Sequence, residues 1–191
     1  EAFDRQVEHL YGRKQAFARV FPGTGPTLEK SFYAETKDYP QRLFLGIIPH
    51  NKTIFNSILE LIEYFHSEVQ NLSSMTKSTP NPYGGKIPTG SSDWVSFIDP
   101  YLTSLTYFLK TTDLSSIHTD IETHVNSSLE DEGYNAITIA ELTGSTLTGE
   151  VASTLEKLEQ PYKPGNPDAV LATSMVSHGV DIDRFNSMFF Y

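Results

Sequence analysis

The chain has 191 residues, no cysteine and a net charge of −10, with 38% hydrophobic and 20% charged residues. This length suits one main domain with its own core, and the lack of cysteine excludes disulfides, thiol catalysis and cysteine-ligated zinc. No apolar stretch approaches the roughly 20 residues that a membrane helix needs, and the N-terminus shows no secretory signal. We therefore expect a globular, cytoplasmic protein without a membrane partner.

The negative charge is unevenly distributed along the chain. Residues 1–50 carry seven Lys or Arg against six Asp or Glu, whereas residues 51–191 carry seven against eighteen. Proteins that coat nucleic acid usually show a basic excess. Any phosphate contact in the second part must therefore be local, made by backbone amides, hydroxyls and helix ends.

The first predicted elements are a strand and a helix. Residues 43–48, with the sequence LFLGII, form an unbroken apolar run that predicts a buried strand of a parallel sheet. Apolar residues then recur at helical spacing over residues 54–69, and Asn51 or Thr53 is available to cap the start of this helix. Residues 1–42 are assigned to an N-terminal extension or linker.

A loop is predicted next, over residues 71–93, because this segment is rich in Ser, Thr, Pro and Gly and lacks periodicity. Its GGK sequence invites a phosphate-loop interpretation of Lys86. However, Pro80 stands where the first glycine is needed, and Ile87 replaces the metal-binding hydroxyl, so the match is poor. We interpret about 71–130 as an insertion in the domain.

Two helices are predicted within the insertion. Asp99 and Pro100 are typical of a helix start, and Leu102, Leu105, Phe108 and Leu109 would share a face. A second helix opens near Asp113, and its predicted buried residues are Ile117, Ile121, Val125 and Leu129.

The polar residues of the second helix allow two interpretations. His118, Asp120 and His124 could be metal ligands, but the two histidines are six residues apart, which does not place both imidazoles on one helical face. A solvated face that also includes Glu122 is the favoured alternative.

The last part of the chain alternates strands and a helix. Residues 136–141 predict a strand that leads to Gly144, and Thr148 is expected to cap the helix that follows. Further strands are predicted at 169–173 and 186–190. Apolar strands that alternate with amphipathic helices indicate an α/β fold, with a parallel sheet flanked by helices on both faces.

Polar residues follow the strand at 169–173, where ligands bind in parallel sheets. Thr173 and Ser174 could bind a phosphate, Gly179 allows a close backbone approach, and Asp181 could accept a hydrogen bond from a ribose hydroxyl. An ordinary turn would use the same residue types.

The sequence VLATSMVSHGVDIDR at 170–184 resembles motif V of superfamily 2 helicases, in their second RecA-like domain. The strand that precedes motif V in this family, together with the helix after it, resembles the segment AELTGSTLTGEVASTLEKLE. Motif IV and its helix resemble the segment RLFLGIIPHNKTIFNSILELI. Thr143 stands where the family usually has histidine, and His178 stands where many members have arginine. Together with FARVFPGTGPTLE and DPYLTSLTYFL, these segments resemble the helicase subunits of DISARM anti-phage systems.

The resemblance implies a RecA-like fold, an ATP-dependent DNA motor, and other subunits of a defence complex as partners. The residues that it implies for contact with the sugar–phosphate backbone are Thr173, Ser174, Gly144, Asn51 and Thr53. It places Gly179 and Asp181 at the cleft that holds ATP, with Mg²⁺ bound mostly by another domain. The DNA would be single-stranded or at a duplex end.

The 191 residues contain no phosphate loop, no Asp-Glu box and no arginine-finger motif. We therefore expect half of an ATPase, and no ATP turnover by this chain alone, because phosphoryl transfer needs the phosphate cradle, the metal and the arginine together. Two alternatives remain open: a nucleotide-binding or small-ligand α/β module, and a non-catalytic interaction scaffold within a larger complex.

Overall fold

The computed structural model of the chain describes residues 43–173 and 185–191. Pro49–Tyr191 form one compact unit, and Glu1–Ile48 belong to a second unit. The described helical elements, in chain order, are α2 (Ile54–Ser74), α3 (Ser92–Ile98), the 3-10 turn η2 (Asp99–Tyr101), α4 (Thr111–Asp120), the π-helical turn η3 (Ile121–Val125), α5 (Asn126–Asp131) and α6 (Thr148–Glu159). The strands are β1 (Ser104–Tyr107), β2 (Ile139–Leu142), β3 (Ala169–Ala172) and β4 (Met188–Phe190).

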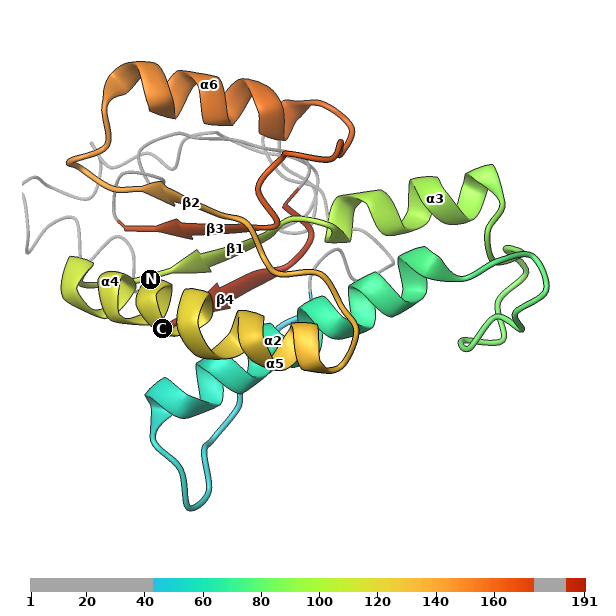
Figure 1. Cartoon of the computed structure of the whole chain (residues 1–191), viewed down its shortest axis with the longest axis horizontal. Helices are drawn as coiled ribbons and strands as arrows, with labels where there is room; N and C mark the ends of the chain where they lie inside the picture. Colours follow the sequence, from blue (N-terminus) through green and yellow to red (C-terminus); the bar gives the residue numbers. More distant parts are fainter. Residues whose placement is uncertain (1–42, 174–184) are drawn as a thin grey trace, which may run out of the picture. The chain divides into compact units, whose positions relative to one another are not determined.

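The four strands form one sheet in the order β2-β3-β1-β4, and each neighbouring pair is parallel. Leu105 of the central strand β1 lies opposite Val170 of β3 on one side and opposite Met188 of β4 on the other. All four strands therefore run in the same direction across the unit (Figure 1). The predicted parallel α/β architecture is confirmed, and it is consistent with a RecA-like fold.

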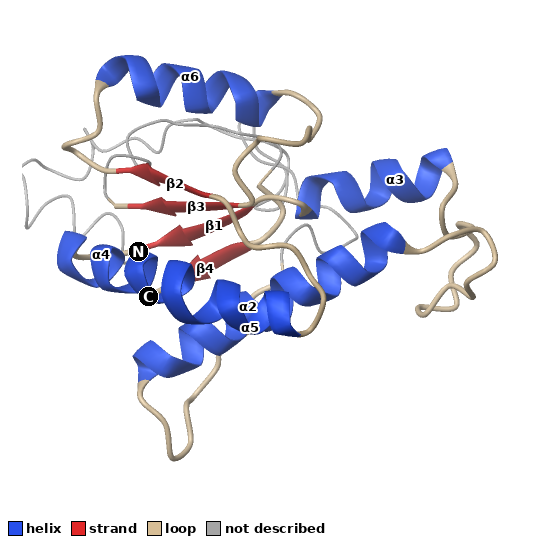
Figure 2. Cartoon of the chain, viewed as in Figure 1, coloured by secondary structure: helices blue, strands red, loops and turns tan. Residues whose placement is uncertain are grey.

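Helices cover both faces of the sheet, as the sequence predicts. On one face lie α2, α4 and α5 (Figure 2). There Ile62, Ile117 and Leu171 are completely buried in a shared apolar cluster. On the other face lies α6, where Leu158 packs with Val170 in a second cluster. Burying each such side chain contributes roughly 1.5–3 kcal/mol, so these two layers hold the sheet in place.

Helix α2 confirms the helix that the sequence predicts after residue 50. Thr53 is its N-cap, and the Thr53 hydroxyl accepts a hydrogen bond from the Asn56 backbone N–H at 3.1 Å. Ile58, Ile62 and Val69 are buried, as their helical spacing predicts. The helix runs to Ser74, further than the apolar pattern indicates.

The strand predicted at 43–48 is wrong. These residues form no strand, and their apolar side chains are exposed, with Ile48 at 93%. An apolar run becomes a strand only where another strand can share its backbone hydrogen bonds. Among the described strands, β1 and β2 occupy the two sides of β3.

The helix predicted from Asp99 through Leu109 is also wrong. Asp99–Tyr101 form only a 3-10 turn, and Ser104–Tyr107 form strand β1. The helical pattern placed Leu105 and Leu109 on one buried face, but Leu109 is 81% exposed, whereas Leu105 is buried. Residues alternate between faces in a strand, and pairing on both sides with β3 and β4 decides this segment.

The helix predicted near Asp113 is confirmed and begins slightly earlier, at Thr111. It continues through η3 into α5, and Ile117, Ile121, Val125 and Leu129 are all buried.

The segment 71–130 therefore consists of two different parts. Residues 104–131 belong to the alternating architecture, because they provide β1 and the helices that connect β1 to β2. The additional part is the loop at 75–91 and α3, which lie beyond the ends where the strands begin (Figure 1). No described helix combines the length and apolar character needed to cross a membrane.

Candidate functional site at the carboxyl ends of the strands

The candidate site lies at the edge of the sheet where all four strands end. In a parallel sheet this edge collects the segments that leave the strands, and ligands bind there. The described segments are Phe108–Lys110 after β1, the turn Thr143–Leu147 after β2, Thr173 after β3 and Tyr191 after β4. The arrowheads of the strands in Figure 2 all point to this edge.

The turn after β2 is held by its own hydroxyl groups. The Thr143 N–H donates to Thr146 Oγ1 at 3.0 Å, and that hydroxyl donates to the Glu141 carbonyl at 3.2 Å. The hydroxyls of Thr143 and Ser145 lie 2.8 Å apart. Short side chains with hydroxyls stabilise turns in this way, so the backbone around Gly144 is held in one conformation.

Helix α6 begins directly after this turn. The sequence predicts Thr148 as its cap, but Leu147 is the N-cap residue and Thr148 is the first helical residue. The Leu147 side chain has no hydrogen-bond acceptor, so it cannot cap the helix. The N-terminus of α6 therefore presents backbone amides without a side-chain cap, next to the turn that carries Gly144.

Gly144 is exposed, and its backbone angle is not in the left-handed region. A Cβ atom added at Gly144 would meet no atom within 4 Å. Neither close packing nor the backbone angle therefore requires a glycine at position 144. A surface that the backbone of a ligand approaches closely would explain it.

Thr173 lies beside this turn. Its backbone N–H donates to the Leu142 carbonyl at 3.1 Å, and this bond joins the ends of β3 and β2. Thr173 is buried. The structure therefore brings together Gly144 and Thr173, two of the residues that the resemblance implies for a nucleic-acid contact.

The other predicted site residues are placed elsewhere. Thr53 caps α2 with its hydroxyl, and Asn51 is exposed and has a φ of 60° in the turn before that helix. Neither follows a strand of the sheet, so the expected strand-to-helix turn at this place is wrong. Ser174, Gly179 and Asp181 lie outside the described residues, and their roles remain predictions.

Sequence reasoning did not find Lys110 as a site residue. This lysine is exposed and lies three residues after the end of β1, as the N-cap residue of α4, so it is at the same edge as Gly144 and Thr173. The prediction missed it because it assigned the residues before Lys110 to a helix and not to a strand that ends at this edge. The β-branched and aromatic content of Ser104–Tyr107, followed by a charge and two threonines, was the available signal.

His118 of α4 contacts Glu141 of β2. Its Nδ1 contacts the Glu141 carboxylate, and its Nε2 lies 3.2 Å from Glu122 Oε1. His118 is therefore half-buried at the flank of the helix and not fully solvated, whereas His124 is exposed as expected. No group of three or more possible metal ligands is present in the described part of the chain.

A groove runs between the edge strand β2 and helix α6. The residues that line it are Ala140, Glu141, Thr146, Gly149, Glu150, Ser153, Thr154 and Lys157. Its two carboxylates, Glu141 and Glu150, would repel the several negative charges of a nucleotide triphosphate held within it. The groove is therefore not the expected nucleotide site.

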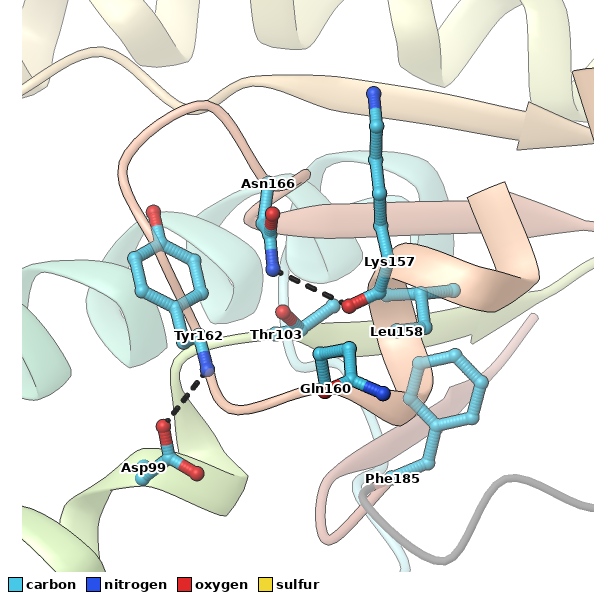
Figure 3. A pocket seen from close by; sticks show the side chains of 8 residues that line it. All are labelled: Asp99, Thr103, Lys157, Leu158, Gln160, Tyr162, Asn166 and Phe185. Atoms are coloured by element: carbon cyan, nitrogen blue, oxygen red, sulfur yellow. Dashed lines mark hydrogen bonds between the residues drawn. The ribbon is translucent and has the colours of Figure 1, made fainter. Parts of the chain in front are cut away.

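A second pocket lies at the opposite edge, where the strands begin (Figure 3). The Tyr162 N–H donates to Asp99 Oδ1 at 2.9 Å, and the Asn166 side chain donates to the Lys157 carbonyl at 3.3 Å. The pocket has room for about one water molecule. These contacts fasten the end of α6 to the start of the sheet, and the pocket is too small for a nucleotide.

Beside this pocket, Asp168 connects three segments. Its Oδ2 accepts hydrogen bonds from the Thr138 N–H at 2.8 Å and from the Thr138 hydroxyl at 2.6 Å. Its Oδ1 accepts a hydrogen bond from the Tyr162 hydroxyl at 2.5 Å. Burial, together with the hydrogen bond and the negative charge of Asp168, raises the pKa of Tyr162 above its usual range. This polar cluster is structural, because every group in it bonds within the fold.

Comparison with known proteins supports the resemblance to a DISARM protein. The chain is similar to the DISARM protein DrmA of Bacillus paralicheniformis, with 25% identity over 194 residues that cover 96% of this chain. The chain spans 16% of the length of that protein. No family model matches the chain.

Proposed function

We propose that the chain is part of an ATP-dependent superfamily 2 DNA helicase or translocase that acts in anti-phage defence. The observation that carries this proposal is the edge at which Gly144 and Thr173 follow two adjacent parallel strands, next to the start of α6, which has no side-chain cap. These residues come from the two segments that resemble neighbouring helicase motifs, and the similarity to DrmA supports the defence role.

In this proposal the edge binds the sugar–phosphate backbone of a DNA strand. The start of α6 offers amides and the positive end of its dipole, Gly144 lets the strand approach, and the Thr173 hydroxyl donates to a phosphate oxygen. Lys110 adds a positive charge at the end of β1. Contacts of this kind position a strand without reading its sequence.

ATP and Mg²⁺ are the proposed cofactors of the complete protein. Gly179 and Asp181 contribute one wall of the ATP cleft, and Ser174 adds a hydroxyl on the DNA side. The phosphate cradle, the metal-binding carboxylates and the arginine finger come from other parts of the protein, because the 191 residues do not contain these motifs. We propose a cytoplasmic location and other defence subunits as partners.

A non-catalytic interaction module within a larger complex is the second candidate. The excess of acidic residues in 51–191 favours it, because such a surface repels DNA outside the local contacts.

The proposal is tested in the complete protein by DNA-stimulated ATP hydrolysis and by DNA binding without nucleotide. Thr173→Ala is expected to weaken DNA binding about 10-fold to 150-fold, because one hydrogen bond to a charged oxygen is lost. Asp181→Ala is expected to reduce ATP turnover while DNA binding stays near normal. Ser96→Ala, which changes an exposed residue of α3, serves as the control. If neither Thr173→Ala nor Asp181→Ala alters DNA-stimulated hydrolysis, the proposal is wrong and the second candidate is favoured.

A further inference from the structure

The loop at 75–91 is long and has no periodicity, yet it is held by many internal hydrogen bonds. The buried Thr89 hydroxyl reaches the carbonyls of Thr76 at 2.8 Å and Thr79 at 2.5 Å. The Asn81 side chain donates to the Ile87 carbonyl at 2.8 Å. Compact surface loops whose ends are close together and that are packed by their own side chains are frequently functional.

The base of this loop is anchored to an apolar cluster. Met75 and Ile87 pack against the cluster that contains Leu72 and Trp94, and the Trp94 indole N–H donates to the Leu72 carbonyl at 2.9 Å. This anchor fixes the loop to the end of α2 and to α3. The tip is therefore presented on a rigid base.

The tip displays an aromatic ring. The Gly84 N–H donates to the Asn81 carbonyl at 3.1 Å, and the Tyr83 N–H donates to the Asn81 side chain at 2.9 Å, which defines a tight turn. Tyr83 lies in this turn and is 67% exposed. A large aromatic side chain that is held by a fixed backbone, but packs little within the fold, is suited to contact a partner.

Acidic residues are also absent from the loop and its immediate flanks. Residues 69–92 contain the lysines Lys77 and Lys86 and no aspartate or glutamate. Both lysines are exposed, and they come before and after Tyr83 in the chain. A polyanion can therefore approach this surface with less repulsion than it meets over most of residues 51–191.

We propose that the loop 75–91 binds single-stranded nucleic acid, with a base stacked on Tyr83 and phosphates bound by Lys77 and Lys86. Stacking on an exposed aromatic ring combined with basic side chains along the backbone is the general way in which proteins hold single strands. The inference rests on the proposed function for its choice of partner. It adds a second contact at the edge where the strands begin, separate from Gly144 and Thr173 (Figure 1).

The test measures binding of a fluorescent oligothymidine strand by the complete protein without nucleotide. Tyr83→Ala is expected to weaken binding about 5-fold to 150-fold, whereas Tyr83→Phe, which keeps the ring, is expected to bind normally. Tyr64→Ala is the matched control, because Tyr64 is 66% exposed on α2. Lys77→Ala and Lys86→Ala should each reduce the slope of log affinity against log salt concentration by about 0.7. Ultraviolet cross-linking of a strand that carries 5-bromouracil should label Tyr83.

The outcomes separate this inference from the proposed function. If Thr173→Ala weakens strand binding and the loop variants behave like Tyr64→Ala, the loop inference is overturned and the proposed function stands. If the loop variants weaken binding and Thr173→Ala does not, the loop inference holds and the edge assignment fails. Absence of strand binding by the unmodified protein overturns both. Capture of an acidic peptide in place of the strand also overturns the loop inference.

Discussion

The imidazole Nε2 of His66 lies 3.0 Å from the Ser104 hydroxyl, and both residues are buried. His66 belongs to α2 and Ser104 begins β1, so this hydrogen bond joins a helix to a central strand of the sheet. The site at the far end of β1 depends on the position of this strand. The bond therefore helps to hold the start of a strand whose other end reaches the candidate functional edge.

The first prediction concerns acid stability. Burial lowers the pKa of His66 from 6.5 to about 4, and the charge of Asp168 opposes this shift only in part. The folded protein therefore keeps His66 neutral while the unfolded chain takes up a proton, so stability is complete above pH 6.5 and falls as the pH decreases toward 4. The shift of about 2.5 pKa units corresponds to roughly 3 kcal/mol.

Urea unfolding of the 191-residue chain between pH 4 and 7 measures this effect, with His66→Gln as the test variant and His124→Gln as an exposed control. The unmodified protein and His124→Gln are expected to lose stability in parallel as the pH falls. His66→Gln should be less stable at pH 7 and should show a smaller loss. Equal losses in all three proteins would show that His66 does not control this transition.

Strand β1, which begins at Ser104, shows why part of the fold could not be predicted from the sequence. Residues 99–109 satisfy a helical start signal and a helical apolar pattern, and a four-residue strand is too short for alternation to compete with that pattern. The deciding interaction is with β3 and β4, which are far away in the sequence. Local patterns do not contain this information.

The site at the carboxyl ends of β2 and β3 was predictable from the sequence, because both strands are apolar runs that end at glycine or hydroxyl residues. The prediction placed Gly144 and Thr173 at the ends of two strands, and the structure places these strands side by side. Lys110 was missed together with β1. Residues 43–48 show the reverse error, since their apolar composition predicted burial that the structure does not have.

A second prediction concerns Asp168, which accepts hydrogen bonds from Thr138 and Tyr162. Asp168→Ala removes a charged acceptor and leaves its donors without this partner, so we expect a loss of about 1–3 kcal/mol in the free energy of unfolding. Asp93→Ala changes an exposed carboxylate in the first turn of α3 and should cost less than about 0.5–1 kcal/mol. Chemical denaturation at pH 7 checks both values. Similar losses in the two variants would contradict a structural role for this cluster.

A third prediction uses two glycines of the loop 75–91 that have nearly the same backbone angle. Gly90 has a φ of 65°, and a Cβ there would lie 2.9 Å from the Lys77 backbone nitrogen. Gly84 has a φ of 63° and open space around a Cβ. Gly84→Ala therefore carries only the backbone cost of roughly 1–2 kcal/mol, while Gly90→Ala adds a clash with the backbone. Limited proteolysis should cut the loop faster in Gly90→Ala than in Gly84→Ala, and equal rates would show that the close contact at Gly90 is unimportant.

The last prediction separates stability from function at Gly144. Because a Cβ at this position meets no atom within 4 Å and φ is not in the left-handed region, Gly144→Ala should leave the free energy of unfolding unchanged or raise it by up to about 1 kcal/mol. If a DNA backbone approaches Gly144 closely, the added methyl group should nevertheless weaken DNA binding by the complete protein. Thermal unfolding and strand binding are measured on the same preparation, with Ser96→Ala as the control. Unchanged DNA binding in a fully stable Gly144→Ala protein would remove Gly144 from the contact surface, because a loss of folding could not explain the result.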